Sequence, residues 1–300
     1  RPAEQVAVTA KTPPPARGRW GGGGLTLESA DRRTRRAGLP GPDSTRVKHL
    51  EGLMERYYSS PGNMHIAAEK VSLASEAPPG VLGDYTASTH LQGELFGAML
   101  DLVILDATNK KYSIDDVMRK MMERFSGTKG YTNKDIEQLV SSTCGCDIHP
   151  FFAEHIFGNQ SVDFNKYLQL AGLHASTTWA DATDDKGKSM ADLEVYSYQL
   201  PGSRIVKIGI TDPAGSWGRA GLHTGDEILT VNGSTMKTAT DFRQLQRKMQ
   251  IGDELLIEVR RQAGVFKTKL TVNGYKQPSV RIEKMRTITK RQESLLGAWK

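Results

Sequence analysis

Cysteine is scarce in this 300-residue chain, which contains only Cys144 and Cys146. Two cysteines cannot make the disulfide framework of a small secreted domain. Because a single residue separates them, they could form at most a strained, easily reduced bridge, and we interpret them as two free thiols. With His149 they spell C-x-C-x-x-H, which lacks the fourth ligand of a structural zinc site, so no metal site is predicted here.

Long hydrophobic runs are also missing. The longest, Leu95 to Leu105, is shorter than a membrane span and contains Asp101, so no transmembrane segment is predicted. The chain begins at Arg1 without a methionine or an apolar signal region, as expected of a processed product or a fragment. The sequence therefore does not indicate a cellular compartment. With 38% hydrophobic and 25% charged residues the composition is typical of a globular protein, and the length suggests about two domains.

Common catalytic signatures are absent from the sequence, including the G-x-S-x-G elbow, the P-loop and the dinucleotide fingerprint. The string from His149 to His155 superficially resembles a metalloprotease helix. Zinc-binding histidines on a helix stand four residues apart, whereas these two stand six apart and fall on different faces. We therefore interpret both histidines as surface or cap residues.

Positive charge is concentrated at the N-terminus. Residues 1–40 hold eight basic and three acidic residues, a net charge of +5 out of +6 for the chain. This stretch also carries Pro13-Pro14-Pro15 and four glycines from Gly21, so it cannot bury enough apolar surface to offset chain entropy. We predict that residues 1–42 are a poorly ordered or degenerate segment. A basic arm that binds nucleic acid is one alternative function, but the arm lacks interleaved aromatic residues, so we do not expect this partner.

Residues 43–173 carry the apolar periodicity and the caps of helices. Ser113 with Asp116, and Thr132 with Asp135, form capping-box starts. The predicted helices run from Ser44 to Tyr58, Ser88 to Asp106, Ile114 to Phe125, Asn133 to Ser142, Pro150 to Gly158 and Asp163 to Leu170. The helix from Ser88 is strongly apolar and is expected to form the core. Residues 174–192 are polar and are interpreted as a linker, and residues 276–300 as a C-terminal tail.

Residues 193–275 alternate short strands with turns. The string A-G-L-H-T-G-D-E-I-L-T-V-N-G, residues 220–233, ends in the strong turn signal Asn232-Gly233. A strand Arg204 to Ile210 and a short helix near Ala220 precede that turn. A helix Asp241 to Met249, capped by Thr240, and strands Glu254 to Arg261 and Val265 to Val272 follow it. This order resembles a PDZ domain in the permuted form carried by bacterial proteases. The predicted fold is thus multidomain, an all-α helical domain followed by a mostly-β PDZ domain.

A PDZ domain implies β-augmentation, in which a peptide adds a strand to an open sheet edge beside a helix. Here the edge is Leu193 to Tyr198 and the helix Asp241 to Met249, so peptides or unfolded protein segments are the expected partners. The predicted peptide-binding residues are Asp192, Leu193, Val195, Phe242, Leu245 and Met249. PDZ carboxylate pockets usually place glycine between apolar residues, whereas this chain has Asp192, whose charge would repel a peptide C-terminus. We therefore expect a PDZ fold without capture of C-terminal carboxylates.

Several strings together resemble the glycyl aminopeptidase-like family of PDZ-bearing zinc metallopeptidases. They are R-A-G-L at 36–39, G-E-L-F-G-A-M-L-D-L at 93–102, S-I-D-D-V-M-R at 113–119, G-Y-T at 130–132 and W-G-R-A-G-L-H-T-G-D at 217–226. The family implies a thermolysin-like domain whose H-E-x-x-H helix and a glutamate bind zinc. Zinc would polarise the scissile carbonyl and acidify its bound water.

When each active-site residue of the family is matched to its position in this sequence, the zinc ligands are not found. H-E-x-x-H is absent and is expected just before residue 1. Counting back from R-A-G-L places Trp20 on the family's tryptophan and Gly23 at the glutamate ligand, and glycine has no ligating atom. His90 falls at the position of the family's oxyanion-binding tyrosine, where it could donate a hydrogen bond.

We therefore interpret the chain as the C-terminal portion of such a metallopeptidase, non-catalytic alone and without a cofactor of its own. A zinc-bearing N-terminal half is a possible contact partner. The first alternative is an adaptor in which the PDZ domain, binding peptides or proteins, is the working part.

Overall fold

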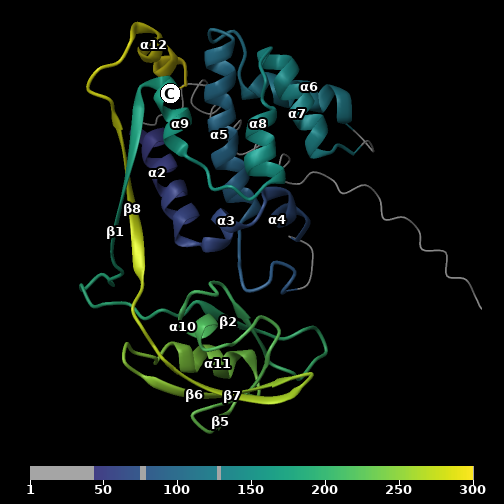
Figure 1. Cartoon of the computed structure of the whole chain (residues 1–300), viewed down its shortest axis with the longest axis vertical. Helices are drawn as coiled ribbons and strands as arrows, with labels where there is room; N and C mark the ends of the chain where they lie inside the picture. Colours follow the sequence, from purple (N-terminus) through teal and green to yellow (C-terminus); the bar gives the residue numbers. More distant parts are fainter. Residues whose placement is uncertain (1–43, 75–78, 127–129, 300) are drawn as a thin grey trace, which may run out of the picture.

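The computed structural model describes residues 44–74, 79–126 and 130–299, and element labels follow Figure 1. The predicted N-terminal segment 1–42, with Trp20, Gly23 and the R-A-G-L string, lies outside the described residues. Within the described ranges, a helical part is followed by a mostly-β PDZ domain, as predicted.

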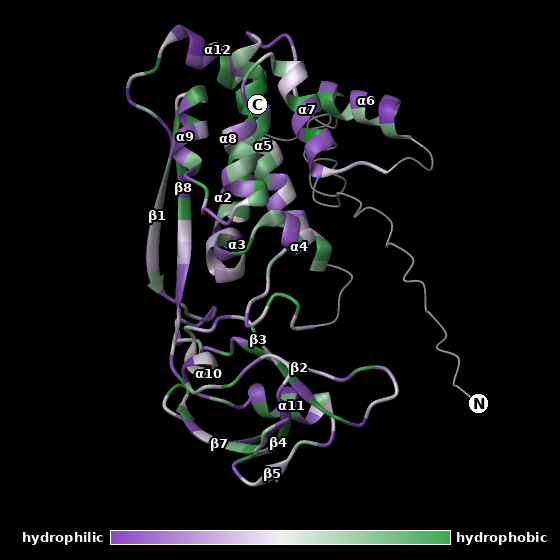
Figure 2. Ribbon diagram, turned by 45° about the vertical axis from the view of Figure 1, so that its right-hand side comes forward, coloured by the Kyte–Doolittle hydropathy of each residue, from purple (hydrophilic) through white to green (hydrophobic). Residues whose placement is uncertain are grey.

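The helical domain is built around α5, Thr89–Ala107, which lies among the other helices of the domain (Figures 1 and 2). Its side chains are buried over most of its length. Ser88 caps this helix, since its Oγ accepts from the N–H of Leu91 at 3.3 Å. Both predicted capping boxes are present, Ser113 with Asp116 on α6 and Thr132 with Asp135 on α7. The elements of this domain are α2 Ser44–Ser59, α3 Pro61–His65, α4 Ala68–Ala74, α5, α6 Ile114–Phe125, α7 Asn133–Cys144, α8 His149–Phe151, the π-helix η1 Phe152–Phe157, α9 Phe164–Leu168 and the 3-10 helix η2 Gln169–Ala171.

Two segments differ from their sequence-based interpretation. Residues 174–192 include most of strand β1, Leu173–Asp181, and residues 276–300 include β8, Lys276–Lys284, and helix α12, Lys290–Trp299. β1 and β8 pair antiparallel along their whole length. The chain therefore leaves the helical domain through β1, forms the PDZ domain and returns through β8 (Figure 1).

The C-terminal segment is an integral part of the helical core. Its Trp299 is buried with Leu295 and Leu296 in the same apolar cluster as α5. The guanidinium of Arg46 lies 4.2 Å from the Trp299 ring centre and donates to the Trp299 carbonyl oxygen at 2.6 Å. The outer edge of β8 is also closed, since Glu55 and Glu51 on α2 accept from the N–H groups of Val280 and Ile282.

The PDZ sheet has the strand order β2-β3-β4-β6-β7, all antiparallel, with β5 added to β4. Its strands are β2 Val195–Tyr198, β3 Lys207–Ile210, β4 Glu227–Val231, β5 Ser234–Thr235, β6 Glu254–Arg261 and β7 Gly264–Thr271, with helices α10 Ser216–Arg219 and α11 Ala239–Gln246. Thr238, rather than the predicted Thr240, caps α11, because Asp241 stands three residues after it and completes a capping box. Asn232 and Gly233 both have positive φ, as their turn requires.

A loop of the helical domain contacts the PDZ domain through Asp84. Its carboxylate accepts from His223 Nδ1 at 2.7 Å and from the backbone N–H of Thr224 at 2.6 Å. Burial alone would raise the pKa of Asp84, but the hydrogen bonds from His223 and Thr224 outweigh burial and lower the pKa. The ionised form of Asp84 therefore stabilises this contact.

Among the helices of the described ranges, none combines the length and the hydropathy that crossing a bilayer requires.

Candidate functional site

The predicted edge strand and the predicted groove helix lie side by side, with β2 at the open edge of the PDZ sheet (Figure 2). The structure brings five of the predicted peptide-binding residues into one apolar cluster between them. Val195, Phe242 and Met249 are buried in the cluster, whereas Leu193 and Leu245 are partly exposed. Only these two therefore offer apolar surface to a ligand.

Along β2, the backbone N–H and C=O groups of successive residues point alternately toward β3 and toward the open edge, as in any antiparallel pair. On the partner strand β3, the N–H of Ile208 donates to Asp226 O and the N–H of Ile210 donates to Thr224 Oγ1, both on the side away from β2. Val195 and Ser197 stand opposite these two residues in the register. Their own N–H and C=O groups must therefore point toward the open edge, where an added strand would bind.

One of these edge groups is already occupied by a side chain of α11. The Nε2 of Gln246 donates to the Val195 carbonyl oxygen at 2.7 Å. The N–H of Val195 turns back to Leu193 O at 2.6 Å. Ser197 Oγ donates to Ala239 O at 2.9 Å, which ties the other end of α11 to the strand. The backbone C=O and N–H groups of Val195 are therefore already hydrogen-bonded within the chain. For Ser197, the described residues show a hydrogen bond of the side chain alone.

Asp192, at the start of the loop before β2, is turned into the domain. Its side chain is buried, and its two oxygens accept from the N–H of Glu194 at 3.1 Å and from the N–H of Ser216 at 3.0 Å. This differs from the expectation of a charge facing the peptide. Asp192 instead takes up the N–H of Glu194, one of the loop donors that a terminal carboxylate would need.

Glu194 adds a further carboxyl group to this loop. Burial, together with the neighbouring carboxylates of Asp192 and Asp212, raises the pKa of Glu194 to about 8, against a smaller opposing effect of Arg219. Glu194 thus holds a proton near neutral pH. Neither Glu194 nor Gln246 was predicted from the sequence, although Gln246 stands one helical turn after Phe242, on the face of α11 that packs toward β2.

The predicted catalytic residue His90 lies in the first turn of α5 and is exposed. Across residues 44–74, 79–126 and 130–299, no group of three His, Cys, Asp or Glu side chains could hold a metal ion. Gly23, at the predicted position of the third ligand, is outside the described residues.

The histidines of α8 and η1 differ in environment. His149 is exposed and pairs with Glu137 at 2.7 Å. His155 is buried rather than on the surface, with Nε2 3.2 Å from the Tyr167 hydroxyl. Burial, its largest effect, lowers the pKa of His155. The interpretation of His155 as a surface or cap residue is therefore wrong, because His155 lies inside η1 and packs against the ring of Phe151.

Comparison with known proteins agrees with this architecture. The family model for the PDZ domain matches residues 188–272. A crystal structure of an aminopeptidase N family protein from Idiomarina loihiensis is 15% identical with a TM-score of 0.57, covering 98% of this chain and 51% of that one. The chain thus spans about half the length of that structure, and at this identity the likeness shows the fold alone. The two matches thus agree on the fold, a helical part that is joined to a PDZ domain.

A second structure, the HtrA3 PDZ domain bound to the phage-derived ligand FGRWV, is 16% identical and has a TM-score of 0.23. It covers 36% of this chain and 92% of that chain. No curated protein sequence matches this chain.

Proposed function

We propose that this chain is the PDZ-bearing C-terminal region of a glycyl aminopeptidase-like zinc metallopeptidase. In this proposal the PDZ domain holds an extended polypeptide segment, and the chain alone does not hydrolyse peptides. The observation that carries the proposal is the edge strand β2, open beside α11, in a domain that leaves and rejoins an aminopeptidase-like helical fold through β1 and β8. The adaptor alternative shares the same binding edge and differs only in whether a catalytic half is its neighbour.

The expected ligand is an internal or unfolded segment rather than a chain terminus. A strand added to β2 gains backbone hydrogen bonds at Ser197 and, after displacement of Gln246, at Val195. A terminal carboxylate would instead need free N–H donors in the loop before β2, where Asp192 already binds the N–H of Glu194. The negative charge of Asp192 further opposes a second carboxylate at this position.

Zinc, in this proposal, belongs to a separate N-terminal half. When bound there, it would supply Lewis-acid polarisation of the scissile carbonyl. The part this chain plays is to hold the polypeptide, through backbone groups of β2 and the partly exposed Leu193 and Leu245. His90 keeps its proposed role as a hydrogen-bond donor to an oxyanion only if that half brings substrate to α5.

Paired peptides test the binding part of the proposal. Fluorescence anisotropy on the full chain would compare extended apolar peptides carrying a free C-terminus with the same peptides amidated. We expect amidated peptides to bind at least as tightly. Strict dependence on a free carboxylate would overturn the internal-segment ligand, and a lack of binding by every peptide would overturn the proposed function of the PDZ domain.

A separate assay tests the catalytic part. The full chain is mixed with zinc and with peptides that begin with glycine, and both stoichiometric metal binding and cleavage are measured. We expect neither. Stoichiometric zinc binding with release of N-terminal glycine would contradict the proposal that the chain is non-catalytic alone.

A further inference from the structure

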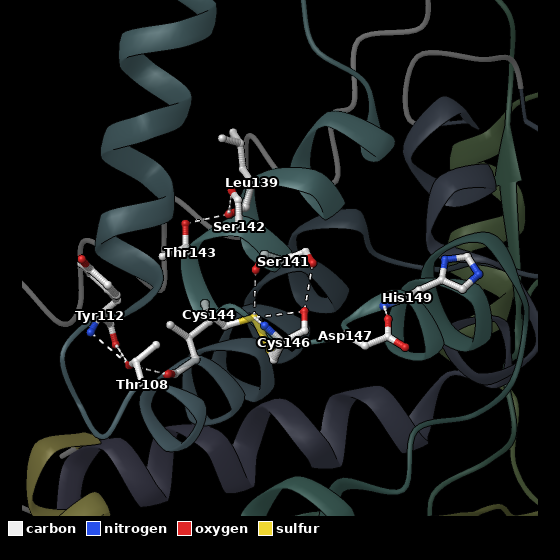
Figure 3. Close-up of a disulfide and its surroundings, with 11 residues drawn as sticks. Thr108, Tyr112, Leu139, Ser141, Ser142, Thr143, Cys144, Cys146, Asp147 and His149 are labelled. Carbon is white, nitrogen blue, oxygen red and sulfur yellow. Dashed lines mark hydrogen bonds between the residues drawn. A yellow bond between two sulfur atoms is a disulfide. The ribbon is translucent and has the colours of Figure 1, made fainter.

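Cys144 and Cys146 form a disulfide in the structure, so the interpretation as two free thiols is wrong (Figure 3). The ring of His149 lies apart from the sulfurs and pairs with Glu137, so the three residues do not assemble as a metal site. The two cysteines are two residues apart at the end of α7. Disulfide stabilisation grows with the length of the closed loop, so this bridge contributes little to the stability of the fold.

We propose that the Cys144–Cys146 disulfide is a reversible thiol–disulfide exchange site that takes two electrons from low-molecular-weight thiols, with Cys146 as the sulfur that is attacked. The two sulfurs differ in access. Cys144 is buried against the helical core. Cys146 is half-buried and lines an open depression together with Ser141, Ser142 and Asp147. A thiolate that approaches in line with the sulfur–sulfur bond therefore reaches Cys146 from solvent.

The surroundings of Cys144 suit a leaving sulfur. The backbone N–H of Cys146 lies 3.2 Å from Cys144 Sγ and can donate to the thiolate as it forms. The carbonyl oxygens of Ser141 and Cys146 each lie 3.5 Å from the same sulfur and can accept from the thiol after it takes a proton. Both forms of the leaving group thus find a partner.

The backbone holds the two cysteines near one another without help from the disulfide. Gly145 takes positive φ, and its N–H donates to Ser141 O at 2.8 Å. Ser141 Oγ donates to Cys146 O at 2.9 Å, as the dashed lines of Figure 3 show. Because neither bond involves a sulfur atom, we expect both to persist after reduction, so that the two thiols stay adjacent and the disulfide can form again.

The exchange balances in two steps. A thiolate bonds to Cys146 Sγ, the Cys144–Cys146 bond breaks, and Cys144 takes a proton. A second thiolate then attacks the outer sulfur of the mixed disulfide, releasing Cys146, which also takes a proton. Two external thiols become one external disulfide, and the chain gains two electrons and two protons.

Glutathione redox buffers test the proposal on the full wild-type chain. After equilibration, samples are acid-quenched and alkylated with N-ethylmaleimide. Intact mass spectrometry then gives the number of alkylated thiols per chain. We expect two alkylated thiols in reduced glutathione, none in oxidised glutathione, and a reversible transition between them. A disulfide that resists every buffer in the folded chain, or two thiols that persist in oxidised glutathione, would overturn the proposal.

The site of attack is tested with single variants. In Cys144→Ser only Cys146 can form an adduct with oxidised glutathione, and in Cys146→Ser only Cys144 can. Because burial restricts access to Cys144, we expect its adduct to form at least about tenfold more slowly. Circular dichroism must show that both variants stay folded; if one does not, the order of attack is measured by trapping and mapping the mixed disulfide in the wild type. Equal rates in the two variants, or a mixed disulfide trapped on Cys144 of the wild type, would contradict the assignment.

Discussion

Replacement of Gln246 by alanine is expected to tighten peptide binding while it weakens the fold. Gln246 Nε2 holds the Val195 carbonyl oxygen at 2.7 Å, at the edge where an added strand would donate its own N–H. A neutral hydrogen bond of this kind contributes about 0.5–1.5 kcal/mol net. If a peptide must break it, its removal should lower the dissociation constant by roughly 2- to 12-fold.

The same change should lower the free energy of unfolding by about 0.5–1.5 kcal/mol, because the unliganded domain loses that hydrogen bond. The two effects have opposite signs, which distinguishes this account from general damage to the domain. Gln244→Ala is the matched control, since Gln244 is exposed on the same helix. Anisotropy with an amidated peptide and urea unfolding measure the two quantities. Unchanged or weaker peptide binding by Gln246→Ala would refute the reasoning.

Three further predictions concern charged groups. Asp192→Ala should lower the free energy of unfolding by about 1–3 kcal/mol in urea, because the buried N–H of Ser216 loses its acceptor; unchanged stability would contradict this. The pKa of Asp84 is lowered from its ordinary value of 3.8, so its carboxylate should stabilise the contact with His223 fully above pH 3.8. This contribution to stability should be lost as the pH falls below that value. Acid titration of unfolding for the wild type and Asp84→Asn tests this, and parallel curves would count against it. Glu194 has a raised pKa of about 8, so its folded form retains a proton between 4.5 and about 8, and wild-type stability should fall across that range relative to Glu194→Gln. A pH-independent difference between these two proteins would show that Glu194 is not perturbed.

Local signals predicted the long helices α2, α5, α6 and α7, whereas the short helices α3 and α4, the C-terminal helix α12 and the distant strand partners escaped prediction. The capping box of Ser113 and Asp116 lies within four residues, so the start of α6 could be read directly. Strand β1 could not, because its side chains are mostly exposed and leave no apolar alternation, and its partner β8 lies about a hundred residues away.

The candidate site was also predicted only in part from the sequence. The edge strand and groove helix followed from the resemblance to PDZ domains, and the structure places them together. The sequence places a charge at Asp192 but does not show that the carboxylate turns inward to bind the N–H of Ser216. It also does not pair Gln246 with Val195, since the acceptor lies 51 positions upstream.

Amide hydrogen exchange at β2 tests the central claim most directly. The account predicts that an amidated extended peptide slows exchange of the Ser197 N–H, because that group points to the open edge and gains an acceptor from the added strand. Protection of Ser197 only by peptides with a free carboxylate, or protection that appears elsewhere and not on β2, would contradict it.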